Sequence, residues 1–182
     1  MSAAALVVFA LRKKVGFKQR LVMAQAMSLT DMRDVVRLQK VVIFGSLGIQ
    51  LAGALVLMCR FLPQYGFRQA AVWGVFHAVS AFCNAGFDIF GSIAPGQSLI
   101  PFNNDPVVLI TLMLLITVGG LGFFVWEELI SQRSFKKCSV YTKLVLVATA
   151  VIILLSAGST LVLEWHNPDT LGNMPVWQKI LN

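Results

Sequence analysis

The sequence predicts an all-α integral membrane protein in which a helix, a re-entrant pore loop and a second helix form a repeat between further transmembrane helices. Of its 182 residues, 57% are hydrophobic and only 13% are charged, whereas soluble globular domains are roughly 25% charged. Three uncharged stretches, residues 41–59, 106–126 and 144–163, are each close to the ~20 residues that a helix needs to cross a bilayer. The mean hydropathy of +0.77 agrees with this class.

The positive charges report the orientation of the chain in the membrane. The net charge is +7, and most of the basic residues lie in two stretches between predicted spans. They are Arg12, Lys13, Lys14, Lys18, Arg20, Arg33, Arg37 and Lys40 in the first stretch, and Arg133, Lys136, Lys137 and Lys143 in the second. Loops with such an excess stay on the cytoplasmic side of a membrane. We therefore expect contact with the lipid bilayer and no nucleic-acid partner.

The N-terminal region has the wrong order of charges for a signal peptide. Residues 1–11 are apolar and precede the basic residues, whereas a signal peptide places its positive charges first. We expect residues 1–11 to be the C-terminal end of a spanning helix and residues 12–40 to be a basic cytoplasmic connector. The start of a new apolar segment at residues 177–181 points the same way, so we expect this sequence to be part of a longer polypeptide.

The centre of the chain, residues 71–90, reads AVWGVFHAVSAFCNAGFDIF. Its apolar first half is too short to cross a bilayer, and the polar and small residues that follow it predict a half-helix that ends in a turn. Backbone in a turn at membrane depth lacks helical partners and is tolerated only where it faces a water-filled path or protein. Residues 41–126 are thus predicted to form one helix, pore loop and helix repeat.

The turn has the composition of an ion-coordinating loop. A potassium ion that enters a narrow pore exchanges its water shell for backbone carbonyls, and Gly86 gives the backbone the freedom to present them. The turn Cys83-Asn84-Ala85-Gly86-Phe87 is therefore predicted to coordinate an ion through backbone carbonyls and not through side chains. The C-terminal end of the half-helix carries partial negative charge and favours a cation. Two interpretations of Asp88 stay open: negative potential at the outer mouth, or a hydrogen bond that fixes the loop.

Other polar residues are interpreted as structural. His77 is expected to be a packed, neutral histidine bonded to a neighbouring helix, and the side chain of Asn84 to lie behind the turn rather than in the pathway. Cys59, Cys83 and Cys138 fall near different depths and suggest neither a disulfide nor a metal site. The glycines of residues 119–122 lack the preceding strand of a dinucleotide loop, so helix packing or local bending explains them better. We expect no cofactor and no enzymatic activity, since no pair of ionisable groups forms a site.

The remaining sequence continues the same alternation. Residues 127–143 are predicted to be a second cytoplasmic loop, and residues 144–182 a spanning helix followed by an external segment. One pore loop cannot surround an ion by itself. Further loops must therefore come from other repeats of a longer chain or from other subunits.

Three motifs resemble a known family. They are FHAVSAFCNAGFDIFGS at residues 76–92, ITVGGLGFFVWEEL at 116–129 and LEWHNPDTLG at 163–172. Together they closely resemble the KtrB-type membrane subunits of bacterial potassium uptake systems, in the Trk/Ktr/HKT superfamily. The resemblance places the family's filter glycine at Gly86 and the neighbouring filter backbone at Cys83, Asn84, Ala85 and Phe87, which implies that the carbonyls of Asn84, Ala85 and Gly86 are the K⁺ ligands. Cys83 is a departure from the small or amide residue expected there.

The resemblance also has implications for the whole protein. Residues 41–126 would be the second of four repeats, with residues 1–11 ending the first and residues 144–182 opening the third. The family implies a homodimer with one pore per subunit, a cytosolic nucleotide-binding ring of KtrA type as partner, and a multi-pass location in the bacterial cell membrane. The alternatives are a small oligomeric cation channel of two-helix subunits and a membrane scaffold that does not transport.

Overall fold

The computed structural model describes residues 32–92, 96, 98–132, 134–168 and 170–181, with side chains from residue 40 onward. Residues 1–11 and most of the connector 12–40 lie outside the described residues, so the predictions for them are not tested. All regular elements in the described ranges are helical, which confirms the all-α fold. They are α3 (Met32–Phe82), η1 (Phe90–Ser92), η2 (Ile100–Phe102), α4 (Pro106–Leu121), α5 (Phe123–Gln132), η3 (Phe135–Lys137), α6 (Val140–Glu164) and α7 (Val176–Leu181).

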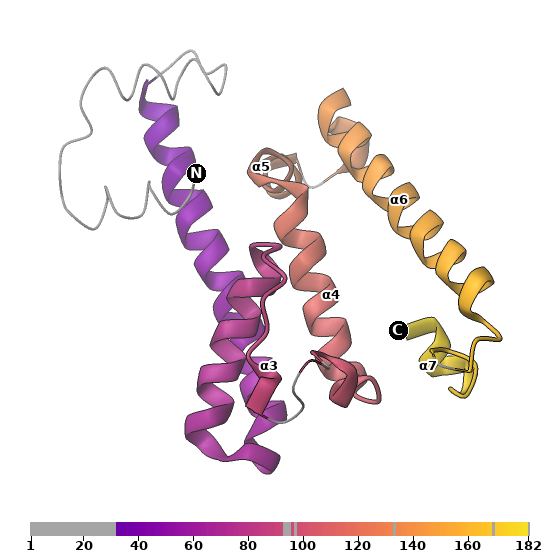
Figure 1. The fold of residues 1–182 in the computed structure, drawn as a ribbon. Helices are drawn as coiled ribbons and strands as arrows, with labels where there is room; N and C mark the ends of the chain where they lie inside the picture. The colour runs from indigo at the N-terminus through magenta and orange to yellow at the C-terminus, as the bar shows by residue number, and fades with distance from the viewer. Residues whose placement is uncertain (1–31, 93–95, 97, 133, 169, 182) are drawn as a thin grey trace. The chain divides into compact units, whose positions relative to one another are not determined.

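The chain divides into two compact units, residues 1–48 and 49–182. The described part of the first unit is the beginning of α3, in which the buried Ser46 hydroxyl donates to the carbonyl of Ile43 at 3.0 Å. The second unit holds every other element, and its arrangement is shown in Figure 1.

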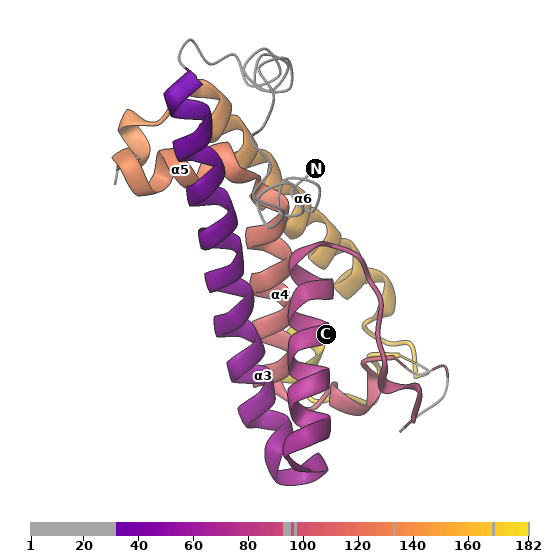
Figure 2. The same ribbon diagram turned by 90° about the vertical axis from the view of Figure 1, so that its left-hand side faces the viewer.

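Helix α3 reverses direction at Gly66, whose φ of 75° and ψ of 166° are non-helical. A left-handed backbone of this kind favours glycine. Residues 49–65 and the half-helix, residues 67–82, consequently run side by side in opposite directions (Figure 2). A Cβ on Gly74 would lie 2.8 Å from the carbonyl oxygen of Ala54, so a glycine is needed for this close approach. The half-helix is about 24 Å long, short of the ~30 Å hydrocarbon core.

An aromatic cluster holds the two arms of α3 to the segment that follows. Phe90 is fully buried, and its ring centroid lies 5.9 Å from that of Phe61, 5.2 Å from Trp73 and 4.6 Å from Phe102. Aromatic pairs of this geometry contribute about 0.5–1.5 kcal/mol each beyond the area they bury. The cluster fixes the chain on both sides of the segment between η1 and η2.

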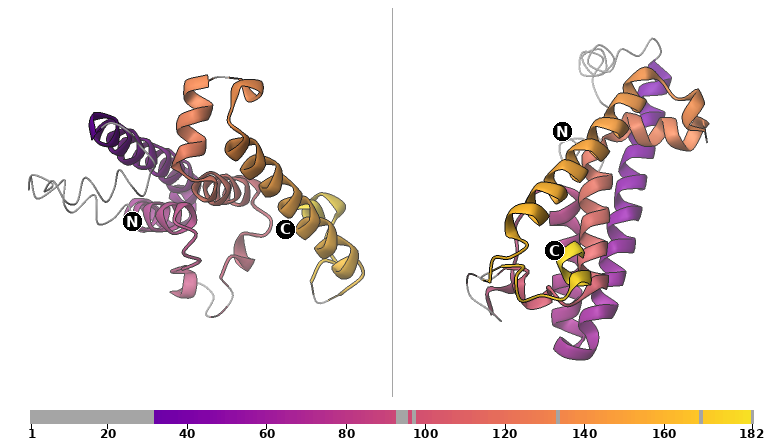
Figure 3. Two further views of the ribbon diagram at one scale, coloured as in Figure 1. Left: turned by 90° about the horizontal axis from the view of Figure 1, so that it is seen from above. Right: turned by 90° about the vertical axis from the view of Figure 1, so that its right-hand side faces the viewer.

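Helix α4 begins at a capped N-terminus and ends at a bend. The side chain of Asp105 accepts hydrogen bonds from the amides of Val107 and Val108. Gly122, with φ 85°, ends the helix, and α5 then turns 94° away from α4. Figure 3 shows α5 running sideways from the end of α4. The uncharged stretch 106–126 is therefore not one straight span, and local bending was one of the two roles expected for its glycines.

Helix α6 is tied to α5 at its start. Ser139 caps α6 through the amide of Thr142, and Glu128 of α5 accepts from the Ser139 amide at 2.5 Å, the Ser139 hydroxyl at 2.7 Å and the Thr142 hydroxyl. Beyond α6, Lys179 of α7 donates to the carbonyl of Trp165 at 2.8 Å. This contact joins the beginning and the end of the predicted external segment.

Some of the described helices have the length and composition of membrane spans. Two of them, residues 40–82 and α6, are long and apolar enough to cross a membrane, or up to three if α4 and α5 count as one bent span. Because residues 40–82 contain the reversal at Gly66, their first arm has the length of a membrane span and their second arm is the half-helix. The chain is an all-α membrane protein.

Candidate functional site

The half-helix ends in a Schellman motif. The amide of Ala85 donates to the carbonyl of Ser80 at 2.9 Å, and the amide of Asn84 donates to the carbonyl of Ala81 at 3.0 Å. This motif needs a left-handed residue just past the helix end, and Asn84 has a φ of 52°. Asparagine is among the few non-glycine residues that tolerate this conformation. The half-helix therefore ends just before Asn84, whose left-handed backbone completes the motif.

The end of the half-helix is seated directly on α4. A Cβ built on Gly119 would lie 1.9 Å from the carbonyl oxygen of Phe82, a distance that no side chain larger than hydrogen allows. One residue on, a Cβ at Gly120 would meet only the Asn84 amide nitrogen, at 3.8 Å. The Asn84 side chain points to the same helix and donates to the carbonyl of Ile116 at 3.4 Å. This agrees with the interpretation that it lies behind the turn.

Two buried polar side chains of the half-helix hold the returning chain. The hydroxyl of Ser80 donates to the carbonyl of Phe87 at 2.7 Å. The Nδ1 atom of His77 bonds the carbonyl of Trp73 at 2.8 Å, and its Nε2 atom lies 3.4 Å from the amide of Ile89. His77 is packed as expected, but the expectation of a bond to a neighbouring helix is wrong. Its partners are its own helix and the chain that leaves the loop, because the loop folds back along the same half-helix.

Asp88 bonds within the loop. Its Oδ1 atom accepts from the amide of Phe90 at 3.2 Å, which is the loop-fixing interpretation of this residue. Negative potential at an outer mouth stays a prediction. The bond helps to direct the chain into η1, where the Phe90 ring stacks on His77 with centroids 4.0 Å apart.

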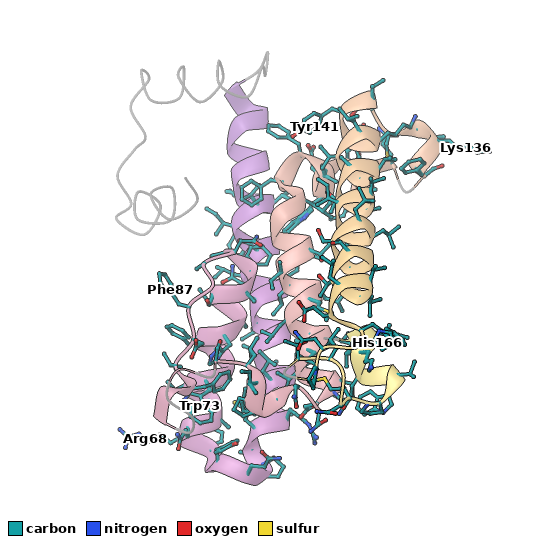
Figure 4. The ribbon with its side chains drawn as sticks, turned by 45° about the vertical axis from the view of Figure 1, so that its right-hand side comes forward. Arg68, Trp73, Phe87, Lys136, Tyr141 and His166 are labelled. Atoms are coloured by element: carbon teal, nitrogen blue, oxygen red, sulfur yellow. The ribbon has the colours of Figure 1, made fainter. Side chains whose placement is uncertain are left out.

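The six residues from Cys83 to Asp88 are all exposed, whereas Ser80, Ala81 and Phe82 just before them are buried. Phe87 is 71% exposed, and Figure 4 shows it on the outer side of the loop. Gly86 has a φ of 72°, and a Cβ there would meet nothing within 4 Å. A substitution would thus strain the backbone without a clash against the described residues. The loop thus exposes main-chain groups on one side, and on its other side hydrogen bonds hold it to the half-helix.

The structure brings together most of the residues that the sequence singled out, and it adds two. Asn84, Ala85, Gly86 and Asp88 lie on one short loop with His77 behind it. The contribution of Ser80 was missed, and for Gly119 helix packing was one of the two expected roles but its partner Phe82 was not predicted. The available signals were a serine six residues before Gly86 and a glycine pair in an otherwise apolar helix, but neither signal identifies the partner of the residue.

Comparisons with known proteins give consistent matches. Residues 1–164 match the TrkH family, described as a cation transport protein. The Ktr system potassium uptake protein B of Bacillus subtilis (strain 168) is 35% identical over 180 residues, which are 99% of this chain and 39% of that protein. The potassium/sodium uptake protein NtpJ of Enterococcus hirae is 34% identical over 143 residues, 79% of this chain and 31% of that protein.

A third relative is the Ktr system potassium uptake protein B of Vibrio alginolyticus, 30% identical over 178 residues, 96% of this chain and 38% of that protein. The chain spans less than two fifths of the length of each of these relatives. All three names are those of uptake proteins, which favours the prediction that the chain is not an enzyme.

Proposed function

The chain belongs to the TrkH family of cation transport proteins, and from this membership and the geometry of the 83–89 loop we propose that it is part of the K⁺-translocating subunit of a bacterial potassium uptake system. The carbonyls of Asn84, Ala85 and Gly86 act as K⁺ ligands within a filter backbone that runs from Cys83 to Phe87. Asp88 adds negative potential at the outer mouth while its hydrogen bond fixes the loop.

One observation carries the proposal. A half-helix that is too short to cross a membrane ends, through a backbone cap, in an exposed loop whose back is held by buried polar side chains. Such a loop presents main-chain oxygens at fixed positions, which is what replaces an ion's hydration shell. The C-terminal end of the half-helix, with its partial negative charge, lies at the start of this loop and favours a cation over an anion.

The wider assembly is also part of the proposal. One loop supplies only one side of an ion site, so further loops complete the ring. The relatives from Bacillus subtilis and Vibrio alginolyticus are named as parts of Ktr systems. We therefore propose a homodimer of the full-length chain in the bacterial cell membrane, regulated by a cytosolic nucleotide-binding ring of KtrA type. The described part of the basic surface that could meet this ring includes Lys136 and Lys137.

The test is the substitution Gly86→Ser in the full polypeptide that carries this sequence. At a φ of 72° a residue with a Cβ is strained by about 1–3 kcal/mol, so the loop shifts and its carbonyls leave their positions. We expect the discrimination of K⁺ over Na⁺ to fall about tenfold or more, measured as competition of each ion with Rb⁺ uptake in bacteria that lack their own potassium uptake.

The matched control is Gly91→Ser. Gly91 lies in η1, has no positive φ, and a Cβ there would meet none of the described residues within 4 Å, so its variant should transport with unchanged selectivity. Unchanged selectivity in Gly86→Ser, with the variant present in the membrane at normal amounts, would contradict the proposed filter. Because one relative is named for potassium and sodium, both ions should be measured directly.

A further inference from the structure

The carbonyls of the 83–89 loop differ in whether a polar side chain behind the loop hydrogen-bonds to them. Ser80 and His77 are 8% and 4% exposed, and both lie on the face of the half-helix that the loop covers. The Ser80 hydroxyl bonds one specific carbonyl, that of Phe87, and the His77 ring receives the amide of Ile89. The end of the loop is thus bound inward, while its beginning is open.

From this asymmetry we infer that Ser80 is a specificity-determining positioning residue: its hydroxyl turns the Phe87 carbonyl away from the ion path and so limits the ligands of this loop to carbonyls that precede Phe87. The inference rests on the proposed function and deepens it. A carbonyl that accepts a 2.7 Å hydrogen bond from the buried side has its oxygen directed toward the half-helix. To bind an ion on the exposed side, its peptide plane would have to rotate and leave the Ser80 hydroxyl without its acceptor.

The cost of that rotation is what makes Ser80 relevant to selectivity. A buried donor that loses its acceptor is destabilised more than an exposed one, because water does not replace the lost bond. With Ser80 in place, the loop keeps a small and fixed ligand set. Without the hydroxyl, the Phe87 carbonyl is free to turn outward and add an oxygen to the site, and a more adaptable site discriminates less between ions of different size.

His77 secures the next peptide. Its Nδ1 atom faces the Trp73 carbonyl, which can only accept, and its Nε2 atom faces the Ile89 amide, which can only donate. Both contacts are satisfied by one neutral tautomer, with the proton on Nδ1. Because the ring is also stacked on Phe90, its plane is fixed. The Phe87 carbonyl is therefore held by Ser80 while His77 holds the amide two residues later.

The experiment compares Ser80→Ala with Ser46→Ala in the full polypeptide. Both serines lie in α3, both are 8% exposed, and both hydroxyls bond a backbone carbonyl, but that of Ser46 is the carbonyl of Ile43 one turn back in the same helix. Ser80→Ala should lower K⁺ over Na⁺ discrimination about three- to tenfold, as expected for the loss of one hydrogen bond, with the maximal rate of Rb⁺ uptake within about twofold of that of the unaltered protein. Ser46→Ala should leave the discrimination unchanged.

Rescue separates a positioning role from a packing role. Ser80→Thr keeps the hydroxyl and should restore most of the discrimination, whereas Ser80→Cys keeps the size but is a weaker donor and should resemble Ser80→Ala. If Ser80→Ala does not accumulate in the membrane, Ser80→Cys takes its place in the comparison. Discrimination that is unchanged in both Ser80→Ala and Ser80→Cys would overturn the inference.

Failure of the inference and failure of the proposed function give different results. If Gly86→Ser loses discrimination and Ser80→Ala does not, the filter stands and the role of Ser80 is wrong. If neither variant changes discrimination, the proposed filter is itself wrong. Loss in Ser80→Ala together with equal loss in Ser46→Ala would also overturn the inference, because it would show a general effect of altering α3.

Discussion

Helices α4 (Pro106–Leu121) and α6 (Val140–Glu164) have similar apolar sequences but different surroundings. Along α4, Val108, Leu112 and Leu115 form a buried stripe, and Gly119 receives the backbone of the half-helix. Along α6 the only buried residue is Thr142, near its start, and none of its apolar window is buried in the described part of the chain. A hydropathy profile therefore finds both helices but does not separate the one that positions the candidate filter from the one that does not.

The two helices are alike at their N-termini. Asp105 caps α4 and pairs with Arg60, its Oδ2 atom lying 2.5 Å from the arginine Nε atom. Ser139 caps α6 and is itself held by Glu128. Each start is thus anchored to another element by a carboxylate. The difference between α4 and α6 lies in the contacts along the helix and not in how the helix begins.

The largest effect is expected from Gly119→Ala in α4. The new methyl group would lie 1.9 Å from the Phe82 carbonyl oxygen, so the end of the half-helix must move by more than an ångström, and the 83–89 loop with it. Overpacking of this kind costs about 1–3 kcal/mol or more. We expect Rb⁺ uptake to fall at least about tenfold and the melting temperature of the detergent-solubilised protein to decrease.

The control for this substitution is the neighbouring residue. Gly120→Ala adds the same methyl group one position along the same helix, where the nearest atom is 3.8 Å away, an ordinary contact. Its uptake and melting temperature should stay close to those of the unaltered protein. If both variants behave alike, the seat of the half-helix on Gly119 is not what positions the loop.

A smaller effect is expected at the two capped starts. Asp105→Ala removes the cap of α4 and the partner of Arg60, which should cost about 1–2 kcal/mol, most of it from the cap, since an ion pair with an arginine that is 45% exposed contributes little. Ser139→Ala should cost about 1 kcal/mol by the loss of the cap of α6. Thermal unfolding in detergent measures both.

The conservative variant Asp105→Asn tests how much of the stability lost in Asp105→Ala comes from the cap and how much from the ion pair. Asparagine caps helices as well as aspartate does, so this variant should recover most of the loss. If it is as unstable as Asp105→Ala, the charge pair with Arg60 is worth more than its exposure suggests. If Ser139→Ala has no effect while Asp105→Ala does, the two starts are not equivalent and the comparison fails at that point.

The sequence was sufficient for the features that depend on length and charge. Uncharged stretches of the right length predicted apolar helices in the first arm of α3, in α4 and in α6, although residues 106–126 bend after α4 and are not one straight span. An apolar run of about half that length followed by Cys83 and Asn84 predicted the half-helix and its turn. These predictions succeed because the cost of placing charges and unpaired backbone groups in a bilayer is large and local. The composition of the turn and the family motifs both indicated Gly86 as the filter glycine, and this assignment stays a prediction.

The features that depend on direction and register were not predictable in the same way. The 94° bend after α4 follows from the conformation of Gly122, and hydropathy is the same whether a helix continues straight or turns. The contact of Gly119 and not Gly120 with Phe82 depends on the rotation of α4 about its axis. The bond from Ser80 to Phe87 requires the loop to fold back on the half-helix, which no local pattern specifies.

The smallest effect is expected from Gly158→Ala in α6, and it is the one that tests the comparison from the other side. A Cβ at Gly158 would meet nothing within 4 Å, and alanine in a helix is favoured over glycine by about 0.5–1 kcal/mol, so the variant should melt at the same or a slightly higher temperature and transport Rb⁺ at the normal rate. Small residues in membrane helices also permit close approach of another helix. A clear loss of uptake in Gly158→Ala would therefore mean that α6 is closely packed in the assembled protein. The exposure that distinguishes α6 from α4 in the described residues would then not hold in the full assembly.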